Sequence, residues 1–281
     1  GNFDKSGTGT FKITSSTNLA GGIVFNKSGT QTFSYTGTAS SYHNYYISSG
    51  STLQMLTGLA LGANNNPYSF FTVLNGGTID LGSFVISGGL STVNASNTGF
   101  LLASGATIKT ANATGLAGSI TCLTKSFSSA ANYEFQGAAT GSFTTTPTAN
   151  TVNDLTINRS AGVTLSQALT ANGNLTLTSG ILTTTGTNTL TLTNPLNTAI
   201  SGGSSTSFIN GPVTWTLGAT STGTYTVPVG VTAAYYPMAF VAGTIASASP
   251  TINVQAFATG VSTADGTTLS GTSGNEYWKI I

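Results

Sequence analysis

The stretches SGTGTFKI (residues 6–13) and SGTQTFSY (residues 28–35) nearly repeat each other, 22 residues apart. Each consists of Gly, Ser and Thr around one large apolar side chain, Phe11 in the first and Phe33 in the second. The pattern continues along the chain as Gly-x-Thr followed by Leu or Ile, starting at Gly50, Gly76, Gly105 and Gly162. A unit of about 20–30 residues that recurs with small drift is typical of a solenoid.

This repeating unit predicts a parallel β-helix. Leu alternates with Thr in NLTLTSG (174–180) and TLTLTN (189–194), as expected of strands with one buried face. A glycine before each strand allows positive φ at the corner, and threonine suits the solvated face. One coil is too short to bury its own apolar face, whereas stacked coils enclose a continuous core. We therefore expect Phe11 and Phe33 in one core column, about 5 Å apart at their Cα atoms.

The sequence changes character from about Ser207 onward. The apolar stretches become longer and richer in aromatic residues, and prolines punctuate them at Pro212, Pro228, Pro237 and Pro250. This spacing suits antiparallel strands of a small β-sandwich. The predicted fold class is therefore all-β, with a parallel β-helix over residues 1–206. A β-sandwich-like domain follows over residues 207–281, and we expect it to continue beyond the end of the chain.

A series of motifs runs through the second half of the chain. Their order is NLTLTSGILTT (174–184), TLTLTN (189–194), SFINGPVTWTL (207–217), GTYTVPVG (223–230), YYPMAF (235–240) and EYWKI (276–280). This order resembles a module of large secreted bacterial surface proteins that are exported by type IX secretion. In those proteins a β-helix rich in Thr, Ser and Gly runs into a strand domain. The resemblance implies an adhesin-like protein class at the cell surface and specifies no reaction.

Charged residues are scarce in this chain. They make up 5% of the sequence, against about 25% in an average soluble domain, and the net charge is +1. So few cations cannot neutralise a run of phosphates, which argues against nucleic acid as a partner. No stretch predicts a transmembrane helix, so we expect no membrane insertion. A net charge near zero favours self-association or attachment to a larger surface assembly.

An enzyme hypothesis for this fold is a polysaccharide lyase or hydrolase. Asp80 and Asp154 fall at different phases of the coil and about three coils apart, which separates them by about 14 Å along the axis. Glycoside hydrolysis uses two carboxyl groups within about 5–9.5 Å of each other. Asp154 with Arg159 is a second catalytic candidate, with a solvated strand edge as the alternative. The prediction is that the protein is not an enzyme and has no catalytic residues.

His43 and Cys122 are the only histidine and the only cysteine. Without a second imidazole or thiol, and without a DxDxDG-type run, the sequence predicts no metal site and no cofactor. Cys122 alternates with polar neighbours in SITCL (119–123), which favours a buried structural thiol over a reactive one.

Two aromatic clusters, SYHNYYI (41–47) and NPYSFF (66–71), form the candidate binding surface. Aromatic rings beside Asn and Ser suit stacking on sugars, with the amides bonding to sugar hydroxyls. The alternative is that these rings fill the core or cap one end of the β-helix. The predicted glycan-binding residues are Tyr42, His43, Tyr45, Tyr46, Tyr68 and Phe70.

Together these features predict a non-enzymatic structural or adhesive protein at the bacterial cell surface. It would be a stiff β-helical stalk or fibre segment that associates with like units or with a larger surface protein. The alternative is a carbohydrate-binding module on a β-helix, and a third hypothesis is the polysaccharide lyase or hydrolase.

Overall fold

The structure of the chain is a computed structural model. This structure describes residues 3–5, 22–35, 43–62, 69–88, 98–138, 141–143, 150–219, 222–232, 234–243, 250–258 and 277–280. The chain is a parallel β-solenoid of about eight turns, which confirms the predicted all-β parallel β-helix. It divides into two compact units, Gly1–Asn153 and Asp154–Ile281, and each is described by itself.

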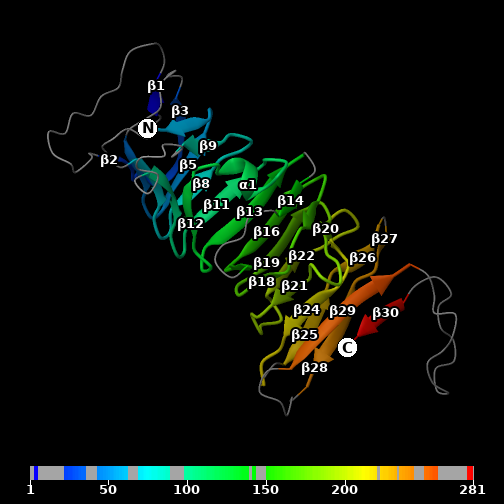
Figure 1. Cartoon of the computed structure of the whole chain (residues 1–281). Coiled ribbons are helices and arrows are strands. Elements are labelled where there is room, and N and C mark those ends of the chain that lie inside the picture. The colour runs from blue at the N-terminus through cyan, green and yellow to red at the C-terminus, as the bar shows by residue number, and fades with distance from the viewer. Residues whose placement is uncertain are drawn as a thin grey trace, which may run out of the picture. The chain divides into compact units, whose positions relative to one another are not determined.

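The N-terminal unit is built from parallel sheets that stack coil on coil (Figure 1). Sheet 1 contains β1 (Phe3–Lys5), β3 (Gly29–Tyr35), β5 (Ser51–Met55), β8 (Thr78–Asp80), β11 (Thr107–Thr110) and β13 (Asn132–Gly137). Sheet 2 contains β2 (Gly22–Phe25), β4 (Asn44–Ile47), β7 (Ser69–Val73), β10 (Thr98–Leu102) and β12 (Thr124–Phe127). Sheet 3 pairs β6 (Leu59–Leu61) with β9 (Ile86–Gly88). The unit also contains β14 (Gly141–Phe143) and β15 (Thr151–Val152).

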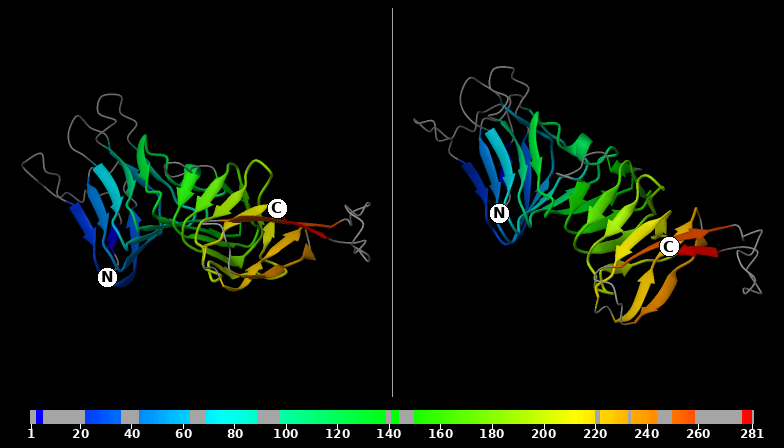
Figure 2. Two further views of the ribbon diagram at one scale, coloured as in Figure 1. Left: turned by 90° about the horizontal axis from the view of Figure 1, so that it is seen from below. Right: turned by 60° about the horizontal axis from the view of Figure 1, so that its bottom comes forward.

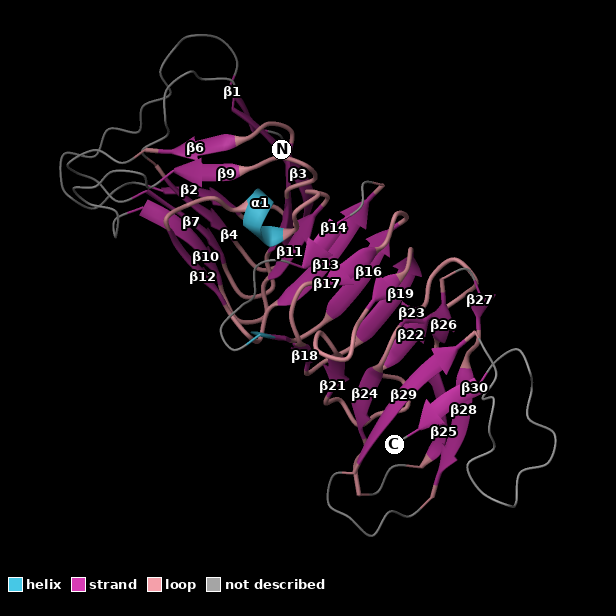
Figure 3. Cartoon of the chain, turned by 45° about the vertical axis from the view of Figure 1, so that its right-hand side comes forward, coloured by secondary structure: helices cyan, strands magenta, loops and turns pink. Residues whose placement is uncertain are grey.

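A single helical turn, α1 (Leu116–Ser119), precedes the position of the third strand in one coil (Figure 3). Ile120, which follows α1 directly, forms an isolated parallel bridge with Ile86 of β9. The hydroxyls of Thr110 and Ser119 are hydrogen-bonded to each other at 2.5 Å in the buried space under this turn. The residues after α1 therefore keep the place of a strand in the stack: the N–H groups of Thr121 and Leu123 donate to the carbonyl oxygens of Ile86 and Gly88 at 3.0 and 3.3 Å.

The corners before the strands of sheet 1 form their own hydrogen-bonded column. The N–H of Gly50 donates to the carbonyl oxygen of Gly76 at 3.0 Å, and the N–H of Gly76 donates to that of Gly105 at 3.1 Å. All three glycines have φ between 71° and 74°, a region that other residues rarely adopt. The predicted role of the corner glycines is confirmed.

Phe33 of β3 is fully buried, but its neighbour in the column is not the predicted one. Its Cα partners are Phe3 of β1 and Met55 of β5. Phe11, the predicted neighbour, lies outside the described residues. The difference arises because β3 pairs with β1, which comes before the SGTGTFKI stretch in the sequence.

Aromatic rings stack inside sheet 2 along the solenoid axis. The ring centroids of Tyr45 and Phe71 are 5.4 Å apart, and those of Phe71 and Phe100 are 6.1 Å apart, both with an interplanar angle of 17°. The three residues are Cα partners on neighbouring strands, so parallel register places equivalent side chains above one another. This stack forms one continuous column of the core of the N-terminal unit.

The C-terminal unit is also built from parallel strands that stack coil on coil (Figure 2). Its parallel strands are β16 (Leu155–Arg159), β17 (Val163–Leu165), β18 (Leu169–Ala171), β19 (Leu175–Ser179), β20 (Leu182–Thr183), β21 (Leu190–Leu192), β22 (Ile200–Gly202), β23 (Ile209–Asn210), β24 (Val213–Thr216) and β26 (Val229–Val231). The leucines of the Leu-Thr repeats are buried, and Leu175 and Leu190 lie in columns that run from strand to strand. The predicted alternation is therefore confirmed.

Antiparallel strands complete this unit. β29 (Thr251–Phe257) pairs with β24 and β30 (Tyr277–Ile280), β25 (Gly223–Val227) pairs with β28 (Met238–Ala242), and β26 pairs with β27 (Ala234–Tyr235). Trp215 of β24 packs edge-on against Tyr225 of β25, with ring centroids 5.0 Å apart. The sequence predicts these antiparallel strands, but not the parallel strands beyond residue 206. The domain boundary at residue 206 stays a prediction.

Candidate functional site

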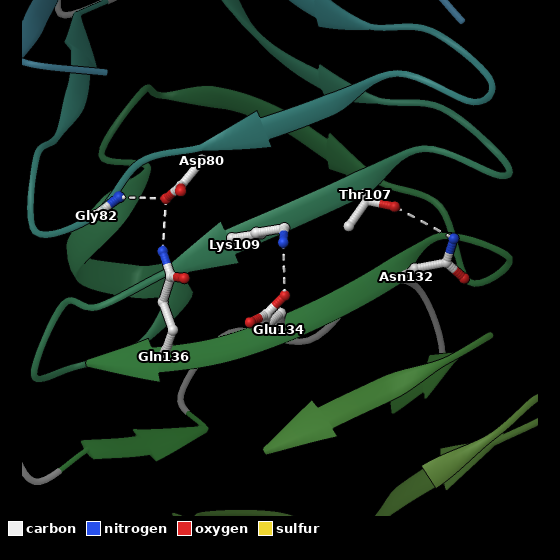
Figure 4. Close-up of polar contacts among 7 residues, drawn as sticks. All are labelled: Asp80, Gly82, Thr107, Lys109, Asn132, Glu134 and Gln136. Atoms are coloured by element: carbon white, nitrogen blue, oxygen red, sulfur yellow. Dashed lines mark hydrogen bonds and ion pairs between the residues drawn. The ribbon is translucent and has the colours of Figure 1, made fainter. Parts of the chain in front are cut away.

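Most of the charged side chains of sheet 1 lie in one column on its outer face (Figure 4). Gln54, Asp80, Lys109 and Glu134 are successive Cα partners on β5, β8, β11 and β13. Neighbouring strands lie about 4.8 Å apart, so the two carboxyl-bearing residues are about 10 Å apart at their Cα atoms, with the lysine between them. This column was not among the predicted sites.

Every charged group in this column has a partner. Lys109 Nζ lies 2.9 Å from Glu134 Oε2, and both side chains are half-buried. Asp80 Oδ1 accepts hydrogen bonds from the backbone N–H of Gly82 at 3.0 Å and from Gln136 Nε2 at 2.5 Å. Beside the column, Asn132 Nδ2 donates to Thr107 Oγ1 at 3.4 Å (Figure 4).

These contacts give the column a structural role. Opposite charges on neighbouring strands stabilise a sheet by about 0.2–1 kcal/mol for each pair. Lys109 neutralises Glu134, and the hydrogen bonds to Asp80 tie a strand end to the following turn and to β13. The column therefore helps to fix the register of three consecutive coils.

Asp154 directly precedes β16 and Arg159 is its last residue, so the two lie about 16 Å apart along the strand. Asp154 Oδ1 accepts the backbone N–H of Asn174 at 2.6 Å, and Asn194 Nδ2 donates to Asn174 Oδ1 at 3.1 Å. Asp154 is thus part of a corner ladder. Arg159 is 0% exposed, and burial lowers the pKa of its guanidinium. The structure does not bring the two together, and the solvated strand edge predicted as the alternative is wrong for Arg159.

The predicted glycan-binding residues separate into different environments. Tyr42 and Tyr68 lie outside the described residues. Tyr45 is 1% exposed and belongs to the aromatic stack, so its ring is not available to a sugar. His43 is half-buried just before β4, and its carbonyl oxygen accepts a hydrogen bond from Ser69 Oγ at 3.0 Å.

Tyr46 and Phe70 are the two predicted residues that the structure places on a common outer face. Tyr45 and Phe71, their chain neighbours, are Cα partners and point into the core. Because side chains alternate along a strand, Tyr46 and Phe70 point away from the core, and both are half-buried. They lie diagonally across neighbouring strands, about 8 Å apart at their Cα atoms.

Cys122 is buried, as the sequence predicts for a structural thiol. Its Sγ lies 3.7 Å from the carbonyl oxygen of Ile86. Burial raises the pKa of the thiol to about 11, with a smaller opposing effect from Lys125. At neutral pH the thiol therefore stays protonated, and a protonated thiol is a poor nucleophile.

Within the described residues no three His, Cys, Asp or Glu side chains come together as a metal site. The same residues contain no helix that is long and apolar enough to cross a membrane.

No family model, no curated protein and no solved structure matches the chain.

Proposed function

We propose that the chain is a non-enzymatic structural module, a stiff β-helical spacer within a bacterial cell-surface adhesin. The observation that carries the proposal is the stacking of coils within each unit, where parallel strands of one coil pair with the equivalent strands of the neighbouring coil. The extracellular location and type IX export rest on the motif order in residues 174–280, which resembles the module of secreted surface proteins.

The contacts within each unit support stiffness. Consecutive coils are joined by backbone hydrogen bonds in the sheets and also at the corners, as in the column from Gly50 to Gly105. Stacked rings and leucines fill the space inside, and equivalent side chains lie above one another from coil to coil. Bending such a stack would separate hydrogen-bonded strands on one side, which opposes deformation.

The spacer role predicts a specific response to force. When the chain is held by its two ends and pulled, its length should stay nearly constant until each unit unfolds in one cooperative step. Optical tweezers would record these steps. The variant Phe71→Ala should lower the force only for the step that belongs to the N-terminal unit, where Phe71 lies in the core. A gradual lengthening at low force, without steps, would contradict the spacer role.

We also propose association with like units or with a larger surface protein. Strand edges at the ends of a solenoid are open to pairing, and the net charge of +1 provides little repulsion between copies. In the described part of sheet 2, β2 is an edge strand, and its Val24 is 53% exposed. Sedimentation of the chain should show larger species as its concentration rises. A constant monomer mass over the whole range would overturn self-association.

A further inference from the structure

The outer face of sheet 2 carries aromatic and aliphatic side chains on adjacent coils. Val24 is 53% exposed and Leu101 is 38% exposed, and they lie in the same row as Tyr46. Thr72, between Tyr46 and Leu101 in this row, points outward but is only 7% exposed. Phe70 lies in the neighbouring row. We call this surface, formed by Val24, Tyr46, Phe70 and Leu101, the aromatic platform.

A glycine makes room for the Tyr46 ring. A Cβ atom at Gly22 would lie 2.6 Å from Cε2 and 3.0 Å from Cδ2 of Tyr46. The ring therefore lies against the backbone of β2, in the space that any other side chain at position 22 would fill. Gly22 and Asn44 are Cα partners, so the ring reaches diagonally across to β2 from its own strand. A ring held in this way is ordered before any ligand arrives.

The platform is almost free of charge. Among the residues of β2, β4, β7, β10 and β12, Lys125 of β12 is the only charged one. An acidic polymer would need several cations, which this face lacks. The polar groups beside the rings are neutral ones, including Asn44, whose Oδ1 accepts the backbone N–H of Phe70 at 2.8 Å. Aromatic rings with neutral amides and hydroxyls match the apolar faces and hydroxyl groups of uncharged sugars.

We propose that the aromatic platform binds a neutral polysaccharide, with sugar rings stacked on Tyr46 and Phe70. This gives the solenoid a binding function in addition to its role as a spacer. The two rings come from neighbouring coils, so one extended glycan chain running along the solenoid axis would contact both. Tyr45 and Phe71 take no direct part, because they face the core.

Affinity electrophoresis of the whole chain tests this proposal. Gels would contain xylan, glucomannan or mixed-linkage β-glucan as neutral probes, and polygalacturonate or alginate as acidic ones. We expect retardation by at least one neutral polymer. Tyr46→Ala and Phe70→Ala should each weaken it about tenfold. Tyr46→Phe should retain binding because the ring remains, whereas Gly22→Ala should weaken it because the new methyl group displaces the ring.

A matched control is Leu196→Ala, which removes an exposed apolar side chain from the other unit and should leave retardation unchanged. Circular dichroism of each variant would confirm that it remains folded. Three results would overturn the proposal: no retardation by any neutral polymer, retardation by the acidic polymers alone, or folded Tyr46→Ala and Phe70→Ala variants that bind as the wild type does. None of these would affect the force response expected of the spacer.

Discussion

Phe71→Ala is expected to lower the free energy of unfolding of the N-terminal unit by about 3–5 kcal/mol. Phe71 is fully buried at the centre of the aromatic stack, with Tyr45 on one side and Phe100 on the other. Removal of the ring would leave a cavity. The neighbouring strands β4 and β10 cannot move in to fill it, because both are held in place by their hydrogen bonds to β7. The loss therefore combines the transfer free energy of the ring with a cavity term.

Phe70→Ala is the matched control for this prediction. It removes the same side chain from the next residue on the same strand, but from the outer face, where the ring is half-buried. We expect the free energy of unfolding to fall by less than about 1.5 kcal/mol. The half-buried ring of Phe70 contributes less buried apolar surface than that of Phe71, and its removal leaves no cavity. Hydrogen exchange of peptides from β4, β7 and β10 would report the stability of this region. Equal losses in the two variants would refute the assignment of faces.

The two substitutions should also separate stability from binding. Phe70→Ala should weaken glycan retention about tenfold while the unit remains stable, because its ring belongs to the aromatic platform. Phe71→Ala should weaken the unit without removing a ring from the platform. Two adjacent residues of the same type thus serve different purposes, because alternation along a strand sends them to opposite faces.

The local features of the fold could be predicted because they depend on short stretches of sequence. A glycine two residues before a Thr-apolar pair indicates a corner, and Leu-Thr alternation indicates a half-buried strand. The structure confirms both at Gly76 and in the strand that contains Leu175 and Leu177. Neither feature requires knowledge of which coil lies above which.

Lateral register was harder to predict because the coils differ in length. Lys109 follows Asp80 by 29 residues, whereas Glu134 follows Lys109 by 25 residues. The second of these coils contains α1 before the position of its third strand, and nothing in the sequence identifies that turn as part of the stack. Thr78, Thr107 and Asn132 are aligned on neighbouring strands, and in each strand the charged residue follows two positions later. This alignment of the strands would have predicted the column.

The aromatic clusters show a second limit of sequence reasoning. Strand alternation requires Tyr45 and Tyr46 to face opposite sides, so both cannot bind one sugar chain. The sequence alone does not decide which ring faces the core, because aromatic residues suit either side. Burial decides it: Tyr45 is 1% exposed and stacks on Phe71, which in turn stacks on Phe100, and these contacts come from residues far apart in the chain.

Gly180→Ala is expected to lower the free energy of unfolding of the C-terminal unit by at least about 3 kcal/mol. Gly180 has a φ of 82°, which costs other residues about 1–2 kcal/mol. A Cβ atom at this site would also overlap the carbonyl oxygen of Arg159 and lie 2.9 Å from the backbone nitrogen of Gly162. The same carbonyl oxygen accepts the N–H of Gly162 at 2.7 Å, so neither atom can move without breaking a corner hydrogen bond.

Gly186→Ala, in a turn of the same unit, is the control, because no atom lies within 4 Å of a Cβ atom there and its φ is not positive. That variant should be neutral or more stable by about 0.4–1 kcal/mol, since alanine reduces the freedom of the unfolded chain. Both tryptophans, Trp215 and Trp278, belong to this unit, so their fluorescence in urea reports its unfolding. Equal urea midpoints for the two variants would mean that the corner at Gly180 can relax around a methyl group. In that case Gly180 would not be tightly packed against the corner that Arg159 and Gly162 form in the preceding coil. A tightly packed corner cannot accept a methyl group unless one of the two coils moves.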